Sequence, residues 1–359
     1  MSGNSIGKHF MVSCFGESHG KCVGIVVDGC PPGLGLSEDV VQRELDKRKP
    51  HSAKLSTTRL EKDRVEILSG IFNGRTTGAP IMMLILNKDV DSQPYDEFRW
   101  KPRPGHADYP ALIRYGGNND YMGGGRFSGR LTAAFVMAGA VAKVYLQSKL
   151  VDVLAYTAEV AGIKAQVPNE KTVIRERIAR NLMRCPDENA AKHMEKLVAA
   201  AREEGDSVGG IVECLSFGMP PGVGNPIFDS LDADLAKMLF DIPAVKGVEF
   251  GSGFRVAELK GSENNDPYTI RDGRVVTTTN NSGGILGGLT NGMPIVVRVA
   301  FKATPSISKR QQTVDLKTMT ETNLEIKGRH DTCIVPRAVP VVEASVAVVL
   351  ADHLLQLGL

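Results

Sequence analysis

The sequence of 359 residues lacks the features that mark several large classes of protein. Its formal net charge is only +2, and its 41 acidic and 43 basic residues are interspersed along the chain. Because nucleic-acid-binding proteins normally concentrate positive charge on one face, this balance argues against a nucleic-acid partner. The N-terminus lacks the charged and then apolar pattern of a signal peptide, and the longest apolar stretch is interrupted by Glu343, Asp352 and His353. We therefore expect a cytoplasmic protein that does not span a membrane.

Motifs for metals, redox chemistry and nucleotides are also missing. None of the six cysteines belongs to a Cys-x-x-Cys pair, so buried, reduced thiols are expected. No two histidines have the spacing of metal ligands, and we predict no metal site. The glycine-rich run 123–130 lacks the Gly-Lys-Ser/Thr ending of a P-loop and the Gly-x-Gly-x-x-Gly spacing of a dinucleotide-binding fold.

Strand-like and helix-like segments alternate along the chain without a regular βαβ order. Strands are predicted at residues 23–28, 65–69, 80–86, 151–159, 210–217, 254–259 and 294–301. Helices are predicted at residues 37–47, 130–149, 188–204, 341–356 and directly after Ser230. Segments 132–146 and 341–350 are apolar nearly all round, which is typical of helices inside a core. The length allows one large domain or two medium ones, and the pattern favours an α+β fold with buried helices covered by sheets.

Glycine is frequent, at 38 residues, and clusters between apolar segments. That distribution is typical of ordered loops that pass close to ligands or to other backbone. Two further stretches, 261–282 and 307–325, are polar, and we predict long mobile loops there. Loops of that length often act as functional lids.

Three short runs place chemically active side chains among glycine or other small residues, where the backbone can approach a ligand closely. They are residues 15–20, 123–130 and 328–333. Arginine supplies a fixed positive fork for carboxylate or phosphate groups, and histidine can move a proton near neutral pH. The middle run leads directly into an apolar helix, whose N-terminus would add N–H groups to an anion site. The runs predict an acid–base enzyme for a small, highly anionic substrate, and they allow for an anionic cofactor.

Two histidines in these loops are candidate catalytic residues. For His19, a functional role is favoured over that of a polar loop residue, because Ser18 and flanking glycines adjoin it. For His106, which follows a Pro-Gly turn, a catalytic role and a helix-capping motif with Asp108 as the cap agree equally well with the sequence.

Other charged residues have simpler interpretations. Asp331 by itself would be interpreted as the ion-pair partner of Arg329 or Arg337. The basic stretch 43–59 is typical of a solvated face, with a phosphate-binding role as the weaker alternative. The remaining histidines without supporting neighbours are expected to be structural or solvated, and they are His9, His51, His193 and His353.

Taken in order, the motifs of this chain resemble those of the chorismate synthase family. The matching segments are residues 16–20, 28–33, 103–108, 123–130, 244–249, 283–288, 328–331 and 337–340, so the resemblance covers essentially the whole chain. It implies a single α+β domain over residues 1–359, with helices sandwiched between antiparallel sheets, that assembles as a homotetramer. It also implies an anti-1,4-elimination of phosphate from 5-enolpyruvylshikimate 3-phosphate to give chorismate. This reaction ends the shikimate pathway and needs reduced FMN without net redox change.

The resemblance also assigns roles to residues. His19 would protonate the reduced flavin or hold the proton on it. His106 would protonate the departing phosphate, and Asp331 would work with the flavin in removing the ring proton. The substrate carries two carboxylates and a phosphate, and the implied substrate-binding residues are Ser18, Arg48, Ser128, Arg130 and Arg337. The implied flavin-binding residues are Arg126, Phe127, Ser128, Gly287, Lys302, Ala303, Thr304, Pro305, Ser306 and Arg329.

The source of the reduced flavin stays open between two alternatives. NADPH could reduce it on this protein, with Arg48 and Lys54 as the implied contacts, or an external flavin reductase could supply it. The absence of a dinucleotide-binding motif favours the external reductase. Two rival functions also stay open: a flavoprotein oxidoreductase with net redox chemistry, and a non-catalytic anion- or RNA-binding protein.

Overall fold

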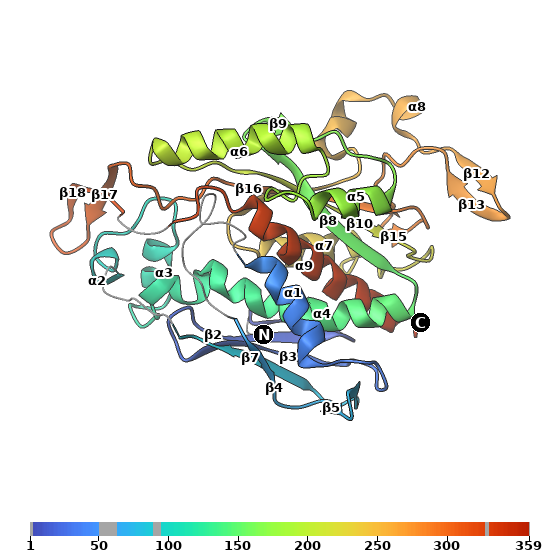
Figure 1. The fold of residues 1–359 in the computed structure, drawn as a ribbon, viewed down its shortest axis with the longest axis horizontal. Coiled ribbons are helices and arrows are strands. Elements are labelled where there is room, and N and C mark those ends of the chain that lie inside the picture. Colours follow the sequence, from blue (N-terminus) through green and yellow to red (C-terminus); the bar gives the residue numbers. More distant parts are fainter. Residues whose placement is uncertain (1–2, 50–62, 89–94, 327–329, 359) are drawn as a thin grey trace.

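The computed structural model describes residues 3–49, 63–88, 95–326 and 330–358 (Figure 1). Two five-stranded antiparallel sheets form its framework. The first sheet has the strand order β1 (Ser5–Ile6), β2 (Met11–Gly16), β3 (Cys22–Asp28), β7 (Ile81–Leu86) and β4 (Val65–Ile67). The second sheet has the order β11 (Val245–Phe250), β16 (Ile295–Phe301), β10 (Gly210–Phe217), β8 (Asp152–Val160) and β9 (Ile163–Lys164). Buried residues alternate along β7 and β16, because one face of each sheet packs on the core.

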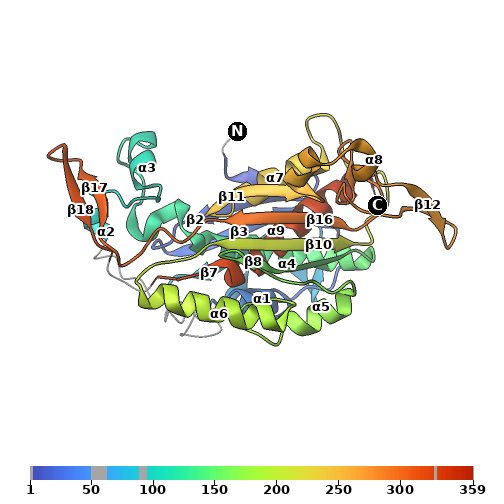
Figure 2. The same ribbon diagram turned by 90° about the horizontal axis from the view of Figure 1, so that it is seen from above.

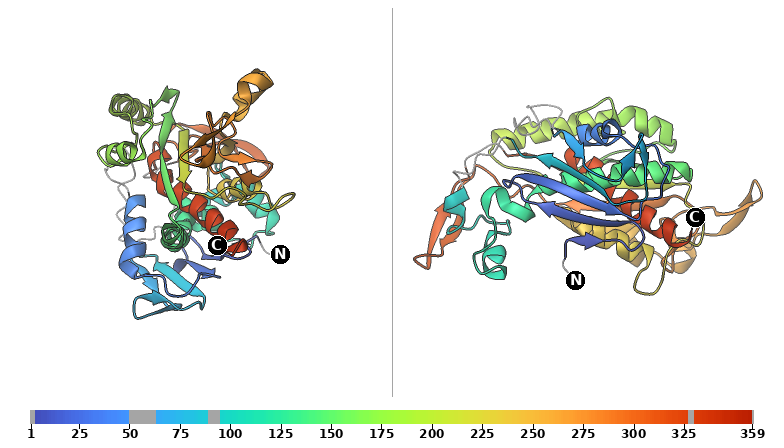
Figure 3. Two further views of the ribbon diagram at one scale, coloured as in Figure 1. Left: turned by 90° about the vertical axis from the view of Figure 1, so that its right-hand side faces the viewer. Right: turned by 90° about the horizontal axis from the view of Figure 1, so that it is seen from below.

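Helices α4 (Thr132–Ser148) and α9 (Val335–Gln356) lie side by side between the two sheets (Figures 1 and 3). α4 packs on β3, and α9 packs on β8 and β10. A Cβ atom added at Gly139 of α4 would lie 2.3 Å from the Cβ of Ala344 of α9, so only glycine permits this approach of the two helices. Helices α1 (Glu38–Arg48) and α7 (Leu231–Phe240) flank the pair. The predicted α+β fold with buried helices between antiparallel sheets is confirmed.

The burial of these helices explains their composition. Segments Gly129–Ser148 and Val335–Gln356 are long and apolar enough to cross a membrane, but 72% and 89% of their most apolar windows are buried inside the protein. They therefore have the environment of core helices. On the outer face of the second sheet, α5 (Lys171–Ile178) and α6 (Glu188–Glu203) add a further layer (Figure 2).

The prediction of long mobile loops at residues 261–282 and 307–325 is wrong, because each stretch contains a β-hairpin. The first holds α8 (Gly261–Asn264), β12 (Tyr268–Arg271) and β13 (Arg274–Thr277), and the second holds β17 (Gln311–Asp315) and β18 (Thr320–Leu324). Between β12 and β13, Asp272 and Gly273 both have positive φ, 51° and 72°, as a two-residue type I′ turn requires. Asp-Gly is a strong hairpin signal that the polar composition obscured.

The strand predicted at 254–259 is also wrong, because η3 (Gly253–Glu258) is a short 3-10 helix. Phe254 is 85% exposed, so the apolar alternation of this segment has no core to face. The last helix begins at Val335, six residues before the predicted start, because Pro336 is tolerated in the first turn of a helix. This extension brings Arg337 into the first turn of α9.

The remaining elements are short. The glycine-rich run forms η1 (Met122–Phe127) and η2 (Gly129–Leu131) just before α4, with positive φ at Gly123, Gly124 and Gly125. α2 (Tyr95–Phe98) lies near the β17–β18 hairpin, where Phe98, Leu324 and Ile326 form a small separate apolar cluster. The other short elements are α3 (Asp108–Arg114), β5 (Ile71–Phe72), β6 (Arg75–Thr76), β14 (Ile285–Leu286) and β15 (Leu289–Thr290).

Candidate active site

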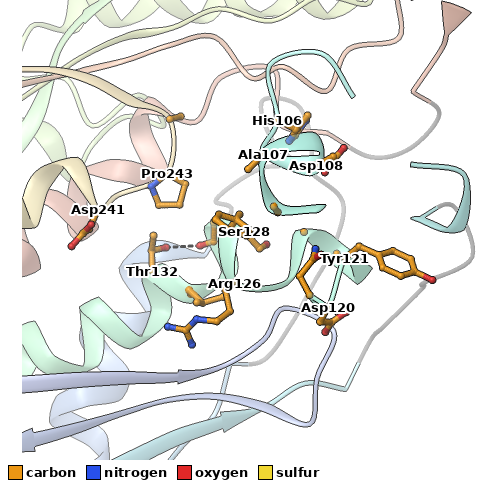
Figure 4. Close-up of a pocket in the computed structure, with 18 of the residues that line it drawn as sticks. His106, Ala107, Asp108, Asp120, Tyr121, Arg126, Ser128, Thr132, Asp241 and Pro243 are labelled. Atoms are coloured by element: carbon orange, nitrogen blue, oxygen red, sulfur yellow. Dashed lines mark hydrogen bonds between the residues drawn. The ribbon is translucent and has the colours of Figure 1, made fainter. Parts of the chain in front are cut away.

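Two adjoining cavities bring the three predicted runs together. The smaller, of about 320 Å³, is here called the arginine cavity and is lined by Ser18, His19, Arg48, Arg130 and Arg337. The larger, of about 750 Å³, is called the large cavity and is lined by His106, Arg126, Phe127, Lys302 and Ser306 (Figure 4). The residues that line both cavities, here called the shared wall, include Tyr95, Gly123, Ser128, Thr132, Thr304, His330 and Asp331.

The N-terminal run and the glycine-rich run pack directly on each other. The backbone N–H of the buried Ser18 donates to the carbonyl of Gly125 at 3.2 Å. The His19 ring stands edge-on to Tyr95, with 5.2 Å between ring centroids. A Cβ atom on Gly123 would lie 2.2 Å from Cδ2 of His19, so the glycine makes room for the imidazole. The sequence-based grouping of these runs therefore corresponds to real contact.

Three arginines reach the arginine cavity from the ends of helical elements. Arg48 is the last residue of α1, Arg130 lies in η2, and Arg337 lies in the first turn of α9. The Arg48 side chain is buried and donates from Nε to Thr132 Oγ1 and from Nη2 to the Gly129 carbonyl, both at 3.0 Å. The guanidinium positions are thus fixed by the protein before any ligand arrives.

Two carboxylates accompany these arginines. Asp63 accepts from Nη1 of Arg48 at 3.3 Å and also from Nη1 of Arg130. Asp331 forms an ion pair with Arg337, which confirms the simple pairing expected from the sequence. Asp331 lines both cavities.

The large cavity is closed on one side by the segment around His106. Nε2 of His106 and Oγ of the buried Ser306 are 2.7 Å apart, and Lys302 Nζ donates to the Gly105 carbonyl at 2.5 Å. Burial, and next the guanidinium of Arg103, lower the pKa of His106 to about 3, so its ring is neutral at physiological pH. Figure 4 shows His106 and Asp108 across the cavity from Arg126 and Thr132.

The capping alternative for Asp108 is wrong. Helix α3 begins at Asp108 itself, and in the described chain its N-cap position, Ala107, provides no side-chain cap. The Asp108 carboxylate instead accepts from Nε and Nη2 of the buried Arg103, both at 2.8 Å. This pair fixes a positive charge close to His106, which agrees with the lowered pKa of that histidine.

Unlike Arg103, two other cations of the large cavity, Arg126 and Lys302, are held by neutral groups. Arg126 donates to the backbone carbonyls of Gly16 and Cys14, at 3.3 and 3.4 Å, and to Asn4 Oδ1 at 2.7 Å. Burial and the charge of Lys246 lower the pKa of Lys302, which is bonded to a carbonyl. Phe127 is 45% exposed and stacks in a tilted geometry on Tyr115, with ring centroids 6.4 Å apart.

Some predicted residues fall outside this constellation. Gly287 lies in the turn between β14 and β15, and it lines neither of the two cavities formed by the described residues. Ala303 also lines neither, although its neighbours Lys302 and Thr304 do. Arg329 and Lys54 lie outside the described residues. Within the described ranges, no cluster of three His, Cys, Asp or Glu side chains could hold a metal ion.

Four residues of the site escaped the sequence analysis: Tyr95, Arg103, Asp63 and His330. Nε2 of His330 and Oγ1 of Thr304 are buried at the shared wall without a hydrogen-bond partner among the described residues. Unsatisfied buried polar atoms of this kind are uncommon and are explained by a ligand or water that completes them. His330 stood beside Asp331 in the third run, where it could have been recognised, whereas no local signal pointed to Asp63.

Comparison with known proteins gives one consistent result. A family model described as chorismate synthase matches residues 10–355. The chain is 56% identical over 356 residues to a chorismate synthase of Dehalococcoides mccartyi, covering 99% of this chain and 98% of that one. It is 54% identical over 350 residues to a chorismate synthase of Thermococcus kodakarensis, covering 98% and 97% of the two chains. A solved crystal structure of chorismate synthase superposes with a TM-score of 0.77 at 30% identity, over 98% of this chain and 93% of that one.

Proposed function

The chain belongs to the chorismate synthase family, carbon–oxygen lyases that complete the shikimate pathway, and we propose that its two adjoining cavities hold the substrate and a reduced flavin. The reaction is the elimination of phosphate from 5-enolpyruvylshikimate 3-phosphate to give chorismate. One observation carries the assignment of sites: three arginines converge on the arginine cavity, and Asp331 lines both that cavity and the large one.

The arginine cavity suits the substrate because the substrate carries two carboxylates and a phosphate. Arg48, Arg130 and Arg337 supply forked donors for such groups, and Ser18 and Ser128 add hydroxyls. Ser18 and Arg48 are buried, and the low exposure to water strengthens their contacts with an anion. Turnover therefore depends on the arginines that contact the leaving phosphate and the ring carboxylate.

The large cavity fits FMN in size and in the chemistry of its lining. Its volume of about 750 Å³ is in the range of ligand pockets. Arg126 and Lys302 provide positive charge, Phe127 an aromatic face, and Thr304 Oγ1 an unsatisfied polar atom. Ser128, Pro305 and Ser306 complete the predicted wall, and we propose the same role for Ala303, Gly287 and Arg329. Reduced FMN, when bound, supplies an electron transiently and helps to take up the ring proton, with no net redox change.

For the two histidines, the geometry supports roles opposite to those that the family resemblance implied. A general acid must lie within hydrogen-bond reach of the group that it protonates. His19 lines the arginine cavity with the three arginines. Of the two cavities formed by the described residues, His106 lines only the large one, beside Lys302 and Ser306. We therefore propose that His19 protonates the departing phosphate and that His106 holds a proton on the flavin side.

Asp331 is proposed as the group that takes the ring proton. Its carboxylate lies at the shared wall, where it faces both cavities, and Arg337 holds it in place. The neighbouring His330 offers its unsatisfied Nε2 to the same region. In this arrangement the phosphate leaves on the His19 side, while the proton is removed where substrate and flavin meet.

We also propose the cellular setting and assembly. The protein folds as a single domain, and the hydrophobic core that both sheets share supports this. It is located in the cytoplasm and assembles as a homotetramer. Ile227, Phe228 and Phe254 are 82%, 91% and 85% exposed and would be covered in such an assembly. The flavin is reduced by an external reductase, while direct use of NADPH at Arg48 and Lys54 is the alternative.

The test is an anaerobic assay with 5-enolpyruvylshikimate 3-phosphate and chemically reduced FMN, without NADPH. Chorismate and phosphate are followed together with the flavin absorbance. Equal release of both products with the flavin still reduced would support the proposal. Oxidation of one flavin per substrate would favour the oxidoreductase alternative, and folded, FMN-binding protein without any product would overturn the assignment.

A further inference from the structure

We propose that Asp63 is a positioning residue that sets the spacing of Arg48 and Arg130 in the arginine cavity; this inference rests on the proposed function of that cavity. Its two carboxylate oxygens are divided between the two arginines, Oδ2 facing Arg48 and Oδ1 facing Arg130. The Asp63 side chain is only 5% exposed. A single buried carboxylate therefore joins two guanidinium groups that come from separate elements.

The backbone around Asp63 is held in turn by helix α1. Gln42 donates from Nε2 to the Asp63 carbonyl at 3.0 Å and accepts the N–H of Val65 at 3.1 Å. Asp63 itself has a φ of 39°, in the left-handed region that a non-glycine residue seldom adopts. Strained backbone of this kind persists where the surrounding structure fixes it, and it occurs often at functional sites. The carboxylate thus has a defined position relative to α1, which carries Arg48.

A second path connects Asp63 to the loop that carries His19. Arg130 donates from Nε to Asn87 Oδ1 at 3.1 Å. The Asn87 side-chain amide donates to the carbonyls of Glu17 and Gly20, at 3.0 and 2.8 Å, on either side of Ser18 and His19. The position of Arg130 is therefore coupled to the position of the proposed general acid.

Charge explains why a carboxylate is needed here. Two guanidinium groups at close range repel each other when water is largely excluded, and Asp63 offsets one of the two charges. Asp63 lines the arginine cavity but, within the described residues, not the large cavity. Its loss should therefore disturb substrate binding and leave flavin binding intact.

The experiment compares Asp63→Asn and Asp63→Glu with the wild type. We expect the KM for 5-enolpyruvylshikimate 3-phosphate to rise about tenfold or more in both variants, while the Kd for FMN stays within about twofold. Glutamate keeps the charge but moves the carboxylate by one methylene, so a normal KM in Asp63→Glu would show that charge alone matters and would overturn the positioning role. A parallel loss of FMN affinity would overturn it as well.

Asp352→Asn is the matched control. Asp352 is also a buried carboxylate, and its Oδ1 accepts the backbone N–H groups of Lys8, His9 and Phe10 far along the sequence. We expect this variant to lower the melting temperature without changing the KM. If it raised the KM as much as Asp63→Asn, the effect would be a general loss of stability and the inference would fail.

A double-mutant cycle with Arg130→Lys tests whether Asp63 acts through the arginine. The effect of Asp63→Asn on KM should be reduced at least about threefold in the Arg130→Lys background, because partners in one network are not additive. Full additivity would overturn the inference. Calorimetric titration with inorganic phosphate gives a readout without turnover: weaker binding by Asp63→Asn supports the inference and unchanged binding opposes it. Failure of the proposed function would appear instead as a wild type without chorismate production.

Discussion

The two cavities hold their cations in different ways. In the arginine cavity, Arg48 and Arg130 share the carboxylate of Asp63, and Arg337 pairs with Asp331. In the large cavity, Arg103 is likewise paired with Asp108, but Lys302 and Arg126 are bonded to backbone carbonyls and an amide oxygen. Paired charges are fixed in place and partly neutralised, whereas cations held by dipoles keep their full charge for a ligand. The arginine cavity thus holds its three arginines by ion pairs, whereas the large cavity also presents two cations, Arg126 and Lys302, that no carboxylate neutralises in the contacts described above.

The largest effect is expected from a change of Asp331, the carboxylate at the shared wall. We expect Asp331→Asn to lower kcat by about 10⁴-fold, because removal of a positioned proton acceptor costs 10²–10⁴ in rate. The anaerobic assay with reduced FMN measures it. The Kd for FMN and the melting temperature serve as controls for folding, and a kcat within about tenfold of the wild type would contradict the proposed role.

The histidines sharpen the comparison because each lines a different cavity. We expect His19→Ala to lower the rate of phosphate release by about 10²-fold with FMN affinity unchanged, because His19 is the proposed acid for the leaving group. His106→Ala should instead alter the FMN absorption spectrum and weaken its binding. Stopped-flow phosphate detection and flavin titration distinguish them. Loss of phosphate release in His106→Ala with normal flavin properties would restore the roles implied by the family.

A smaller effect is expected from Lys302, a cation of the large cavity that is bonded to a backbone carbonyl. Lys302→Ala should raise the Kd for FMN about tenfold, since a hydrogen bond to a charged group contributes about 1.5–3 kcal/mol, and it should leave the KM for substrate unchanged. Fluorescence titration measures the Kd. Lys309→Ala is the control, because Lys309 forms an exposed ion pair with Asp206 seven residues along the same segment. Equal effects of the two substitutions would refute a specific role for Lys302.

The smallest effect on turnover is expected from a buried ion network outside both cavities. Lys143 of α4 pairs with Glu44 of α1 at 2.6 Å and with Glu343 of α9. Burial alone would raise the pKa of Glu44, but Lys143 and Lys47 lower it to about 2. Glu44→Gln should reduce the free energy of unfolding by about 3 kcal/mol at pH 7, with kcat nearly unchanged.

The pH dependence of that loss follows from the lowered pKa. A carboxylate with a depressed folded-state pKa stabilises the protein above its unfolded value of about 4.3 and loses that contribution as the pH falls towards 2. The difference between wild type and Glu44→Gln should therefore be constant from pH 7 to 5 and shrink below that. Urea denaturation at several pH values measures it, and a difference independent of pH would contradict the network.

The site residues that could be predicted are those that belong to a pattern formed by their neighbours in the sequence. Short glycine-flanked runs predicted Ser18, His19 and Arg130, and the structure brings them together through contacts such as His19 on Gly123. The buried helices were predicted because apolar residues cover them all round. Asp63 could not be predicted, because an isolated carboxylate gives no local pattern and its partners are 15 and 67 residues away.

Errors in the fold prediction have similarly local causes. Segment 254–259 alternates like a strand, yet Phe254 and Val256 find no core, and tertiary packing rather than pattern decides such cases. The start of α9 was predicted six residues too late, although the first turn of a helix accepts the proline at position 336. The first error concerns the presence of a packing partner, which is a property of the folded chain, and the second concerns the exact end of a helix.

The close approach of α4 and α9 at Gly139 has a consequence for the chemistry. Arg130 lies two residues before α4, and Arg337 lies in the first turn of α9, seven residues before Ala344. At a rise of about 1.5 Å per residue, the helix crossing is only about 10 Å from the arginine of α9. The distance between two of the proposed substrate-binding arginines therefore depends on the absence of a side chain at Gly139, inside the hydrophobic core. A larger residue in the core at position 139 would therefore be expected to change the distance between these two arginines as well as the packing of the helices.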